Sequence, residues 1–377
     1  MRRRSFLTGG LSLLGSSILA GCRPSSRTGL QVYFLKNAFP TQLLKQFQQQ
    51  LPANERVQWT VKPQLQDLFA QLEQWGEQPL NSLATAPLVS LGDYWLVSAQ
   101  QQKLIQPLDP AQLRHWQQLP ERWQQLVQRG SQQTPAQPAR TAIKQEVWGA
   151  PYRWGMTVIA YRKDKFEQLG WLPADWQDLW RSPLRHRLSL LDHPREVIGL
   201  TLKKLGYSYN TNAPAKIADL ERELAQLNRQ ALFYSSDTYL QPLVLGDTWA
   251  AVGWSTDVLP LMRRNDKIGV IVPRSGTALW ADVWVRPALE IPPPAVALQN
   301  SWMDYWWQPA IANALSQFSD ALSPLLTDLQ PNGPAKKLLL PDQPLFERSE
   351  FLLPLSKTAI EEYDTLWTQM RQPSSPT

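Results

Sequence analysis

Apolar residues along the first hundred positions change period in a regular way. Residues 30–35 form a short apolar run typical of a strand, and the apolar positions after it recur at helical spacing over 43–51. Alternating apolar residues predict a second strand at 57–61, helical spacing returns over 65–72, and a third strand is expected at 87–91. This succession of strands and helices predicts a parallel sheet with helices on its faces.

A second series of elements follows a polar segment. Residues 128–142 show no periodicity and predict a solvated loop. The strands expected after this loop are 157–161, 188–191, 232–234, 249–253, 268–272 and 278–285. The helices expected there are 194–205, 217–227, 301–307, 309–318 and 357–370. The two series together predict an α/β protein with two lobes, each a mostly parallel sheet flanked by helices.

The start of the chain has the features of an export signal. Three arginines at positions 2–4 precede an apolar run at 6–20, and Leu19-Ala20-Gly21-Cys22 is a small-residue cleavage site that ends in cysteine. These are the features of a bacterial lipoprotein signal, and Arg3-Arg4-Ser5-Phe6-Leu7 also resembles a twin-arginine export signal. The apolar run of about 15 residues is shorter than the ~20 residues that span a bilayer.

Cleavage of this signal would leave a chain held to the membrane by lipid. We expect residues 1–21 to be removed, Cys22 to be lipidated and residues 22–29 to act as a tether outside the cytoplasmic membrane. Cys22 is the only cysteine, so the lipidated chain has no thiol for a disulfide, a nucleophile or a thiolate metal site. No later apolar stretch reaches about 18 residues, so the lipid is the only membrane anchor expected.

Charge and motif content exclude several classes of protein. The net charge of +6 falls to +3 without the three arginines of the signal, and no basic cluster recurs at helical spacing, so a nucleic-acid partner is not expected. The chain lacks the motifs of α/β-hydrolases, P-loop ATPases and zinc proteases. We expect no catalysis, no metal and no cofactor. Frequent acidic residues leave an exported hydrolase with paired carboxylates as an alternative.

Aromatic residues beside acids are the main candidates for binding chemistry. The chain has 18 tryptophans. Segments 91–95, 253–257 and 279–284 each place an aromatic beside an acid, and segment 191–197 places acids where a strand gives way to a helix. Carboxylates can neutralise a small organic cation while tryptophan rings hold it by cation–π contact. A neutral sugar would use the same rings.

Structural roles compete with ligand roles at several of these residues. In a strand at 278–285, the period of two puts Trp280 and Asp282 on one face. Glu196 gains from the helix dipole in the first turn of its helix, and the simplest role for Asp192 is to cap that helix. Most tryptophans are expected in the core, and Trp302 and Trp306 lie four apart on one helix face that is predicted to pack.

Several segments of the chain are distinctive when taken together. They are Trp148-Gly-Ala-Pro-Tyr152-Arg-Trp-Gly, Pro194-Arg-Glu-Val-Ile-Gly-Leu, Lys204-Leu-Gly-Tyr-Ser-Tyr-Asn-Thr211, Val252-Gly-Trp-Ser255 and Leu279-Trp-Ala-Asp-Val-Trp284. With these segments the chain resembles the spermidine/putrescine-binding proteins of ABC importers. The resemblance covers about residues 30–370. It implies the two-lobed periplasmic-binding-protein fold, which closes on a ligand in the cleft between its lobes. The lobes are expected at 30–156 plus 281–334 and at 157–280 plus 335–371, with a disordered tail at 372–377.

The resemblance also implies which residues bind the ligand. In that family a tryptophan and an aspartate that match Trp280 and Asp282 grip an amine, and further positions of the family site match Trp254, Glu196 and Tyr94. Other positions depart from the family: His193 stands at a second acid, Leu35 and Ala38 at an aromatic pair, and Leu352 near a glutamine. Asp93 is a candidate substitute for the missing acid on the first lobe.

The sequence therefore predicts a lipid-anchored, monomeric solute receptor of the periplasm. It would capture a small cation, such as spermidine or putrescine, and deliver it to a membrane permease driven by a separate ATPase. A receptor for a sugar or another neutral solute is the main alternative. If His193 lines the cleft, its protonation should repel a bound cation, so amine affinity should fall as the pH drops through ~6.5.

Overall fold

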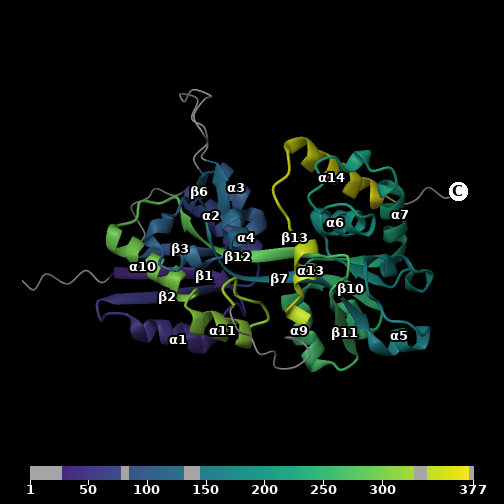
Figure 1. Ribbon diagram of the computed structural model, residues 1–377, viewed down its shortest axis with the longest axis horizontal. Coiled ribbons are helices and arrows are strands. Elements are labelled where there is room, and N and C mark those ends of the chain that lie inside the picture. The colour runs from purple at the N-terminus through teal and green to yellow at the C-terminus, as the bar shows by residue number, and fades with distance from the viewer. Residues whose placement is uncertain (1–27, 78–84, 131–144, 327–337, 373–377) are drawn as a thin grey trace, which may run out of the picture.

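Residues 28–77, 85–130, 145–326 and 338–372 are described by the computed structural model. They form two lobes side by side, with helices on the faces of a mixed sheet (Figure 1). This arrangement confirms the predicted α/β fold class. Cys22 and the rest of the predicted signal lie outside the described residues. No helix in the described ranges is both long enough and apolar enough to cross a membrane.

The sheet of the first lobe is built from the strands predicted near the start of the chain. β1 (Thr28–Leu35) lies between β2 (Glu55–Lys62) and β3 (Ala86–Gly92) and is parallel to both. β12 (Ala278–Pro287) continues this sheet antiparallel to β3. β1 begins two residues inside the segment that was predicted as a tether.

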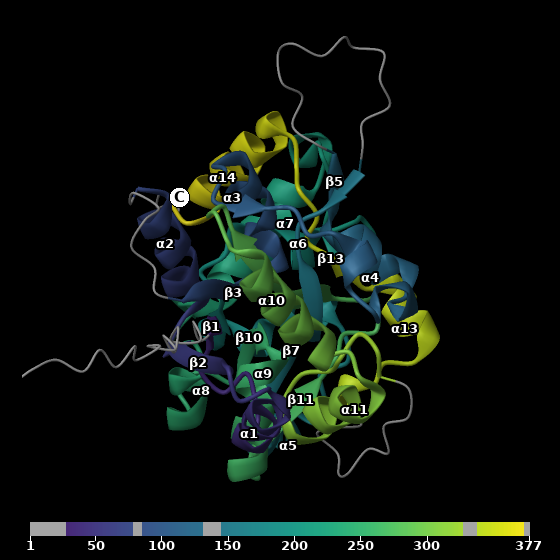
Figure 2. The same cartoon turned by 90° about the vertical axis from the view of Figure 1, so that its left-hand side faces the viewer.

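Helices cover this sheet and bury the apolar positions that the helical period predicted. α1 (Thr41–Gln50) and α2 (Leu65–Gly76) turn an apolar stripe towards the core. α10 (Pro293–Tyr305) packs against β1 and β3 and is seen crossing the sheet in Figure 2. The other elements outside the second lobe's sheet are α3 (Leu96–Gln101), β4 (Ile105–Gln106), α4 (Glu121–Val127), β5 (Gln128–Gly130), β6 (Gln145–Val147), α11 (Pro309–Phe318) and α13 (Gln343–Arg348).

The second lobe has its own set of strands. β8 (Leu188–Leu190) lies between β10 (Ala250–Trp254) and β9 (Ala231–Tyr234), parallel to both. β7 (Ala150–Arg162) runs antiparallel to β10, and β11 (Ile268–Ile271) pairs with the other edge of β7. The helices around these strands are α5 (Lys163–Leu169), α6 (Pro194–Lys204), α7 (Leu220–Gln230), α8 (Gln241–Leu245), α9 (Ser255–Arg264) and α14 (Lys357–Met370).

Two long strands join the lobes. Residues 150–156 of β7 pair with β12, and residues 157–162 pair with β10 and β11. β12 itself begins beside the short strand β13 (Glu350–Phe351). Because the ladders share β7 and β12, one hydrogen-bonded network of 11 strands runs through both lobes. All 13 residues of β7 are buried, so the strand shows no polar alternation, and the sequence predicted only its second half.

Many of the tryptophans are core residues, as the sequence predicted. Trp302, Trp306 and Trp307 are fully buried at the end of α10 and just beyond it. Trp284 is also fully buried and stacks on Tyr152, with 4.5 Å between the ring centroids. The tryptophans that remain partly accessible at the junction of the lobes are therefore the ones that could face a ligand.

Candidate ligand site at the strand crossing

The candidate site lies where β7, β10 and β12 meet. Side chains alternate along a strand, so residues 153, 155 and 157 of β7 share one face. The ladder register sets Arg153 opposite Asp282, Gly155 opposite Trp280, and Thr157 opposite Trp254. Three of the predicted site residues therefore stand in one row along the strand that joins the lobes.

Gly155 makes room for the ring of Trp280. A Cβ atom at position 155 would lie 2.2 Å from a ring carbon of Trp280 and 2.6 Å from the Ser255 hydroxyl oxygen. Only glycine at this position leaves the space that the indole occupies. Trp280 remains partly exposed.

Asp282 is held by a buried arginine. Nε of Arg153 donates to Asp282 Oδ2 at 2.6 Å, and Nη2 lies 2.5 Å from the same oxygen. Each side chain is only 3% exposed. Burial alone would lower the pKa of Arg153, but the Asp282 carboxylate and the Tyr152 hydroxyl raise it above its usual value, so the guanidinium stays charged. The carboxylate that the family resemblance assigns to an amine already has a cationic partner.

Glu196 is a buried acid with only neutral donors. Thr157 Oγ1 lies 3.0 Å from both carboxylate oxygens, and Trp254 Nε1 donates to Oε1 at 3.2 Å. The residue is 3% exposed, and this burial raises the pKa of its carboxyl to about 7 despite both hydrogen bonds. The neighbouring Arg195 directs its guanidinium to the Leu353 and Tyr209 carbonyl oxygens and the Asn210 side chain instead.

Asp93 directly follows β3, next to β12. It begins a short 3-10 turn after β3, and its Oδ1 accepts a hydrogen bond from the Ala281 backbone N–H at 3.0 Å. Burial raises the pKa of its carboxyl to about 7, and the nearby charge of Asp282 acts in the same direction. Asp93 therefore lies near the other predicted site residues, but its carboxyl is buried and bound to the backbone of β12.

Tyr94 and His193 meet across the junction of the lobes. Their ring centroids are 5.1 Å apart, and Tyr94 is otherwise exposed. Burial and the charge of Arg195 lower the pKa of His193 to about 4, so the pH at which this ring would repel a cation moves from the predicted ~6.5 to about 4. The expected fall in amine affinity near pH 6.5 is withdrawn for this reason.

His193, and not Asp192, caps α6. Nδ1 of His193 accepts a hydrogen bond from the Glu196 backbone N–H at 3.3 Å. The predicted cap at Asp192 is wrong, because that carboxylate faces outward and pairs with Arg371 at 2.7 Å. The cap also orients the first turn of α6, which carries Glu196 to the row on β7.

Asp257 and Tyr239 belong to the same neighbourhood but were not predicted as site residues. The Tyr239 hydroxyl donates to Asp257 Oδ2 at 2.9 Å and accepts from the Trp254 backbone N–H at 3.1 Å. Asp257 lies in the first turn of α9 and remains exposed. The sequence feature that could have identified Asp257 is segment 253–257, which places an acid close to Trp254. Nothing in the sequence pairs Arg153 with Asp282, because that pairing depends on strand register.

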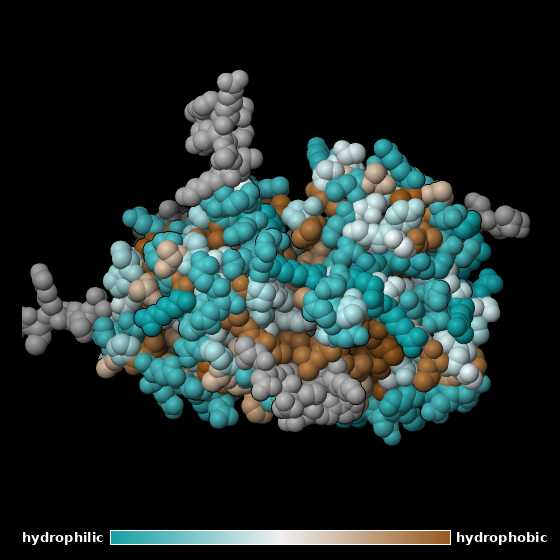
Figure 3. Space-filling model, in the orientation of Figure 1, coloured by the Kyte–Doolittle hydropathy of each residue, from teal (hydrophilic) through white to brown (hydrophobic). Residues whose placement is uncertain are grey.

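Further contacts tie the lobes together around this site. Gln64 Nε2 donates to Asp237 Oδ1 at 3.0 Å, and Arg263 pairs with Asp320 at 2.5 Å. With the Tyr94 and His193 rings, these contacts join residues of the first lobe to residues of the second. The surface is still hollowed between the lobes on the upper side of the view in Figure 3.

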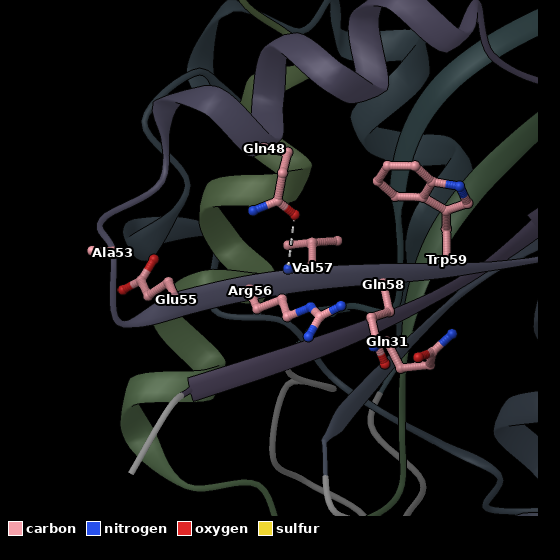
Figure 4. A pocket seen from close by; sticks show the side chains of 8 residues that line it. All are labelled: Gln31, Gln48, Ala53, Glu55, Arg56, Val57, Gln58 and Trp59. Atoms are coloured by element: carbon pink, nitrogen blue, oxygen red, sulfur yellow. Dashed lines mark hydrogen bonds between the residues drawn. The ribbon is translucent and has the colours of Figure 1, made fainter. Parts of the chain in front are cut away.

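A separate hollow lies far from the strand crossing, at the outer edge of the first lobe. Its volume is about 730 Å³, and it is lined by Gln31, Gln48, Ala53, Glu55, Arg56, Val57, Gln58 and Trp59 (Figure 4). These side chains come from β1, β2 and the region around the end of α1. None of the predicted site residues borders this hollow.

The chain matches known proteins by sequence and by fold. A family model described as bacterial extracellular solute-binding protein matches residues 88–345. The spermidine/putrescine-binding periplasmic protein of Escherichia coli is 30% identical over 141 residues, which is 37% of this chain and 40% of that protein. The putrescine/cadaverine-binding protein of Pseudomonas aeruginosa is 25% identical over 237 residues, or 59% of this chain and 66% of that protein. The matched stretch thus spans about two fifths of the first relative's length.

Solved structures share the fold over nearly the whole described chain. The spermidine/putrescine substrate-binding protein PotD of Streptococcus pneumoniae superposes with a TM-score of 0.73 at 19% identity and covers 91% of this chain and 98% of its own. A periplasmic thiamin-binding protein gives a TM-score of 0.58 at 16% identity, with 96% and 98% coverage. These relatives are solute-binding proteins and not enzymes, as the sequence predicted. The chain belongs to the family of bacterial extracellular solute-binding proteins.

Proposed function

We propose that this protein is the receptor of an ABC importer and captures a small organic cation between its lobes. The polyamines named for its relatives, spermidine and putrescine, are the reference ligands. A membrane permease, driven by a separate ATPase, would take the ligand from the receptor. The protein would work as a monomer in the periplasm, held to a membrane by lipid on Cys22.

The state of Glu196 is the observation that best supports a cationic ligand. Its carboxyl is buried, accepts hydrogen bonds from neutral donors, and pairs with no lysine or arginine within the described residues. An ammonium group that entered beside it would restore its charge and form a charge-assisted hydrogen bond. The partly exposed rings of Trp254 and Trp280 would hold the methylenes of the same ligand.

The strand crossing supports a closing motion. β7 and β12 continue from one lobe into the other, so a small change in their twist would rotate the lobes about the row of site residues. We place the lobes at 30–156 plus 281–334 and at 157–280 plus 335–371. The contact between Tyr94 and His193, which is already present in the described structure, would help to hold the lobes together around the ligand.

A thermal-shift series tests the ligand class. The mature protein would be heated with putrescine, cadaverine, spermidine, 1-aminobutane and a panel of neutral sugars. A ligand at 100 times its Kd stabilises the folded state by ~2.7 kcal/mol, which raises the melting temperature by several degrees. Stabilisation by amines alone supports the proposal. Stabilisation by a sugar, with none by any amine, would replace it with a neutral-solute receptor.

A further inference from the structure

We infer that Arg153 occupies the place of one ligand ammonium, so that this receptor prefers amines with a single positive charge over diamines. The inference rests on the proposed function, because it takes an amine to be the ligand. It narrows that function by naming the residue that sets how much positive charge the site accepts.

The first support is the geometry of the buried pair. Arg153 and Asp282 are direct cross-strand partners, and both nitrogens that face the carboxylate lie within 2.6 Å of one oxygen. The pair is enclosed, with each side chain 3% exposed. A second cation that approached Asp282 would therefore meet a guanidinium at close range with little water to screen the repulsion.

The second support is the contrast with Glu196. This acid, on α6, accepts hydrogen bonds from Thr157 and Trp254, which are neutral donors. Thr157 lies four residues after Arg153 on the same face of β7 and is the cross-strand neighbour of Trp254. The charge of Arg129 favours the ionised form of Asp93, and its Oδ1 is tied to the backbone of β12. Glu196 is thus the acid best placed to receive an ammonium group, while Arg153 closes the other end of the row to a second charge.

A matched pair of amines tests the inference. Putrescine and 1-aminobutane share a four-carbon chain and differ in one terminal ammonium group. Calorimetric titration of the mature protein should give a Kd for 1-aminobutane no weaker than that for putrescine. The Arg153→Met variant, which frees Asp282, should shift the ratio of the two Kd values towards putrescine by at least tenfold. The double variant Arg153→Met/Asp282→Asn should return the ratio to within about threefold of the parent.

A second neutral substitution at position 153 tests the same loss of charge in case Arg153→Met does not fold. Arg153→Gln removes the charge but keeps a donor for Asp282, and it should shift the ratio in the same direction as Arg153→Met. Arg153→Lys keeps the charge and should leave the ratio unchanged. Circular dichroism would confirm that each variant is folded.

The outcomes separate the inference from the function on which it rests. Putrescine binding to the parent tenfold more tightly than 1-aminobutane, or a ratio unmoved by the neutral variants, overturns the role of Arg153 and leaves an amine receptor. A parent that binds neither amine but binds a neutral solute overturns the proposed function, and the inference with it.

Discussion

At the scale of single residues, the charge balance of the site differs from what the sequence suggested. Asp282 was predicted to pair with a ligand ammonium, but its carboxylate is bound to Arg153 in the described structure. Glu196 and Asp93, by contrast, are buried and form no ion pair within the described residues. Burial raises the pKa of each carboxyl to about 7, although the charges of Arg195 and Arg129 act in the opposite direction. Replacing any one of these groups should therefore affect stability as well as binding.

Asp282→Asn should destabilise the protein markedly. The substitution leaves the buried Arg153 charge uncompensated, and breaking such a pair typically costs ~3 to 5 kcal/mol of unfolding free energy. Urea unfolding followed by circular dichroism would measure this loss. The double variant Arg153→Met/Asp282→Asn, which buries no unpaired charge, should recover most of it. A single variant as stable as the parent would show that the pair is solvated.

Ammonium binding beside Glu196 should release a proton. The carboxyl has a pKa of about 7 in the free site, and a bound cation would lower that pKa, so affinity should rise with pH from 6 to 8 and then level off. Titrations in two buffers with different ionisation enthalpies would count the protons released. Glu196→Gln should bind at least tenfold more weakly and without the pH effect.

Asp93→Asn is the matched control for this experiment. Asp93 has a similarly raised pKa, but its carboxylate is held by the Ala281 backbone. The variant should keep the pH dependence of the parent. If Asp93→Asn abolishes the pH dependence of amine affinity and Glu196→Gln retains it, the ammonium group binds on the first lobe.

At the scale of the elements, the first turn of α6 combines a helix cap with a candidate ligand-binding residue. His193 closes the first turn of this helix and contacts Tyr94 of the other lobe, while Glu196 projects from the same turn. One short segment therefore fixes the helix start, a contact between the lobes and the candidate ligand acid. The cap also makes the stability of the second lobe depend on pH.

His193→Asn should make the acid side of the stability profile shallower. The unfolded chain binds a proton at His193 near pH 6.5, whereas the folded chain does so only near pH 4, so the folded state loses stability as the pH falls between these values. The loss attributable to His193 is about 2 kcal/mol between pH 7 and pH 5. Asparagine keeps a capping side chain without the titration. Urea unfolding at both pH values, with His186→Asn as the control, would measure the difference.

The sequence predicted elements better than it predicted the contacts between them. Periodicity located β1, α1 and α2 because the apolar face of each is buried against the core. It also located β2, although only Val57 of the alternating apolar residues is buried there and Trp59 and Val61 are exposed. It missed the first half of β7, which is buried throughout and has no contrast between a buried and an exposed face. The pairing of Arg153 with Asp282 follows from the register of two strands more than a hundred residues apart, which no local pattern encodes.

The site was predictable to a similar degree. Trp280, Trp254 and Glu196 do gather at the crossing, since the aromatic-acid segments fall at the ends of strands and the start of a helix. Asp93 also lies there, while Tyr94 and His193 meet between the lobes. Their role in binding stays a prediction. The raised pKa values of Glu196 and Asp93 and the low pKa of His193 could not be predicted from the sequence, because they depend on how far each group is removed from water.

At the scale of the whole molecule, the described chain begins at Thr28, six residues after the proposed lipid attachment site. β1 starts at that residue and lies inside the first lobe's sheet. The proposed tether is therefore short, and it would hold the first lobe close to the membrane surface. The lipid should be the sole anchor.

Cys22→Ala should leave the protein exported but free in solution. Fractionation of cells that produce the variant should find it in the soluble periplasmic fraction, whereas the parent should stay with membranes. Amine binding by the released variant should match that of the parent, because Cys22 is not one of the candidate ligand-binding residues. A variant that stayed in the membrane fraction after a high-salt wash would point to a second anchor.

The passage of β7 through both lobes also limits how such receptors can be recombined. A chimera that joined the first lobe of this chain to the second lobe of a relative would have to change parent in the middle of a buried strand, between Met156 and Thr157. Arg153 and Gly155 lie before that junction, and Thr157 lies directly after it. Exchanging a lobe would therefore combine candidate site residues from two different proteins in one strand. New specificities in this architecture should arise more readily by point substitutions along β7 than by exchange of lobes.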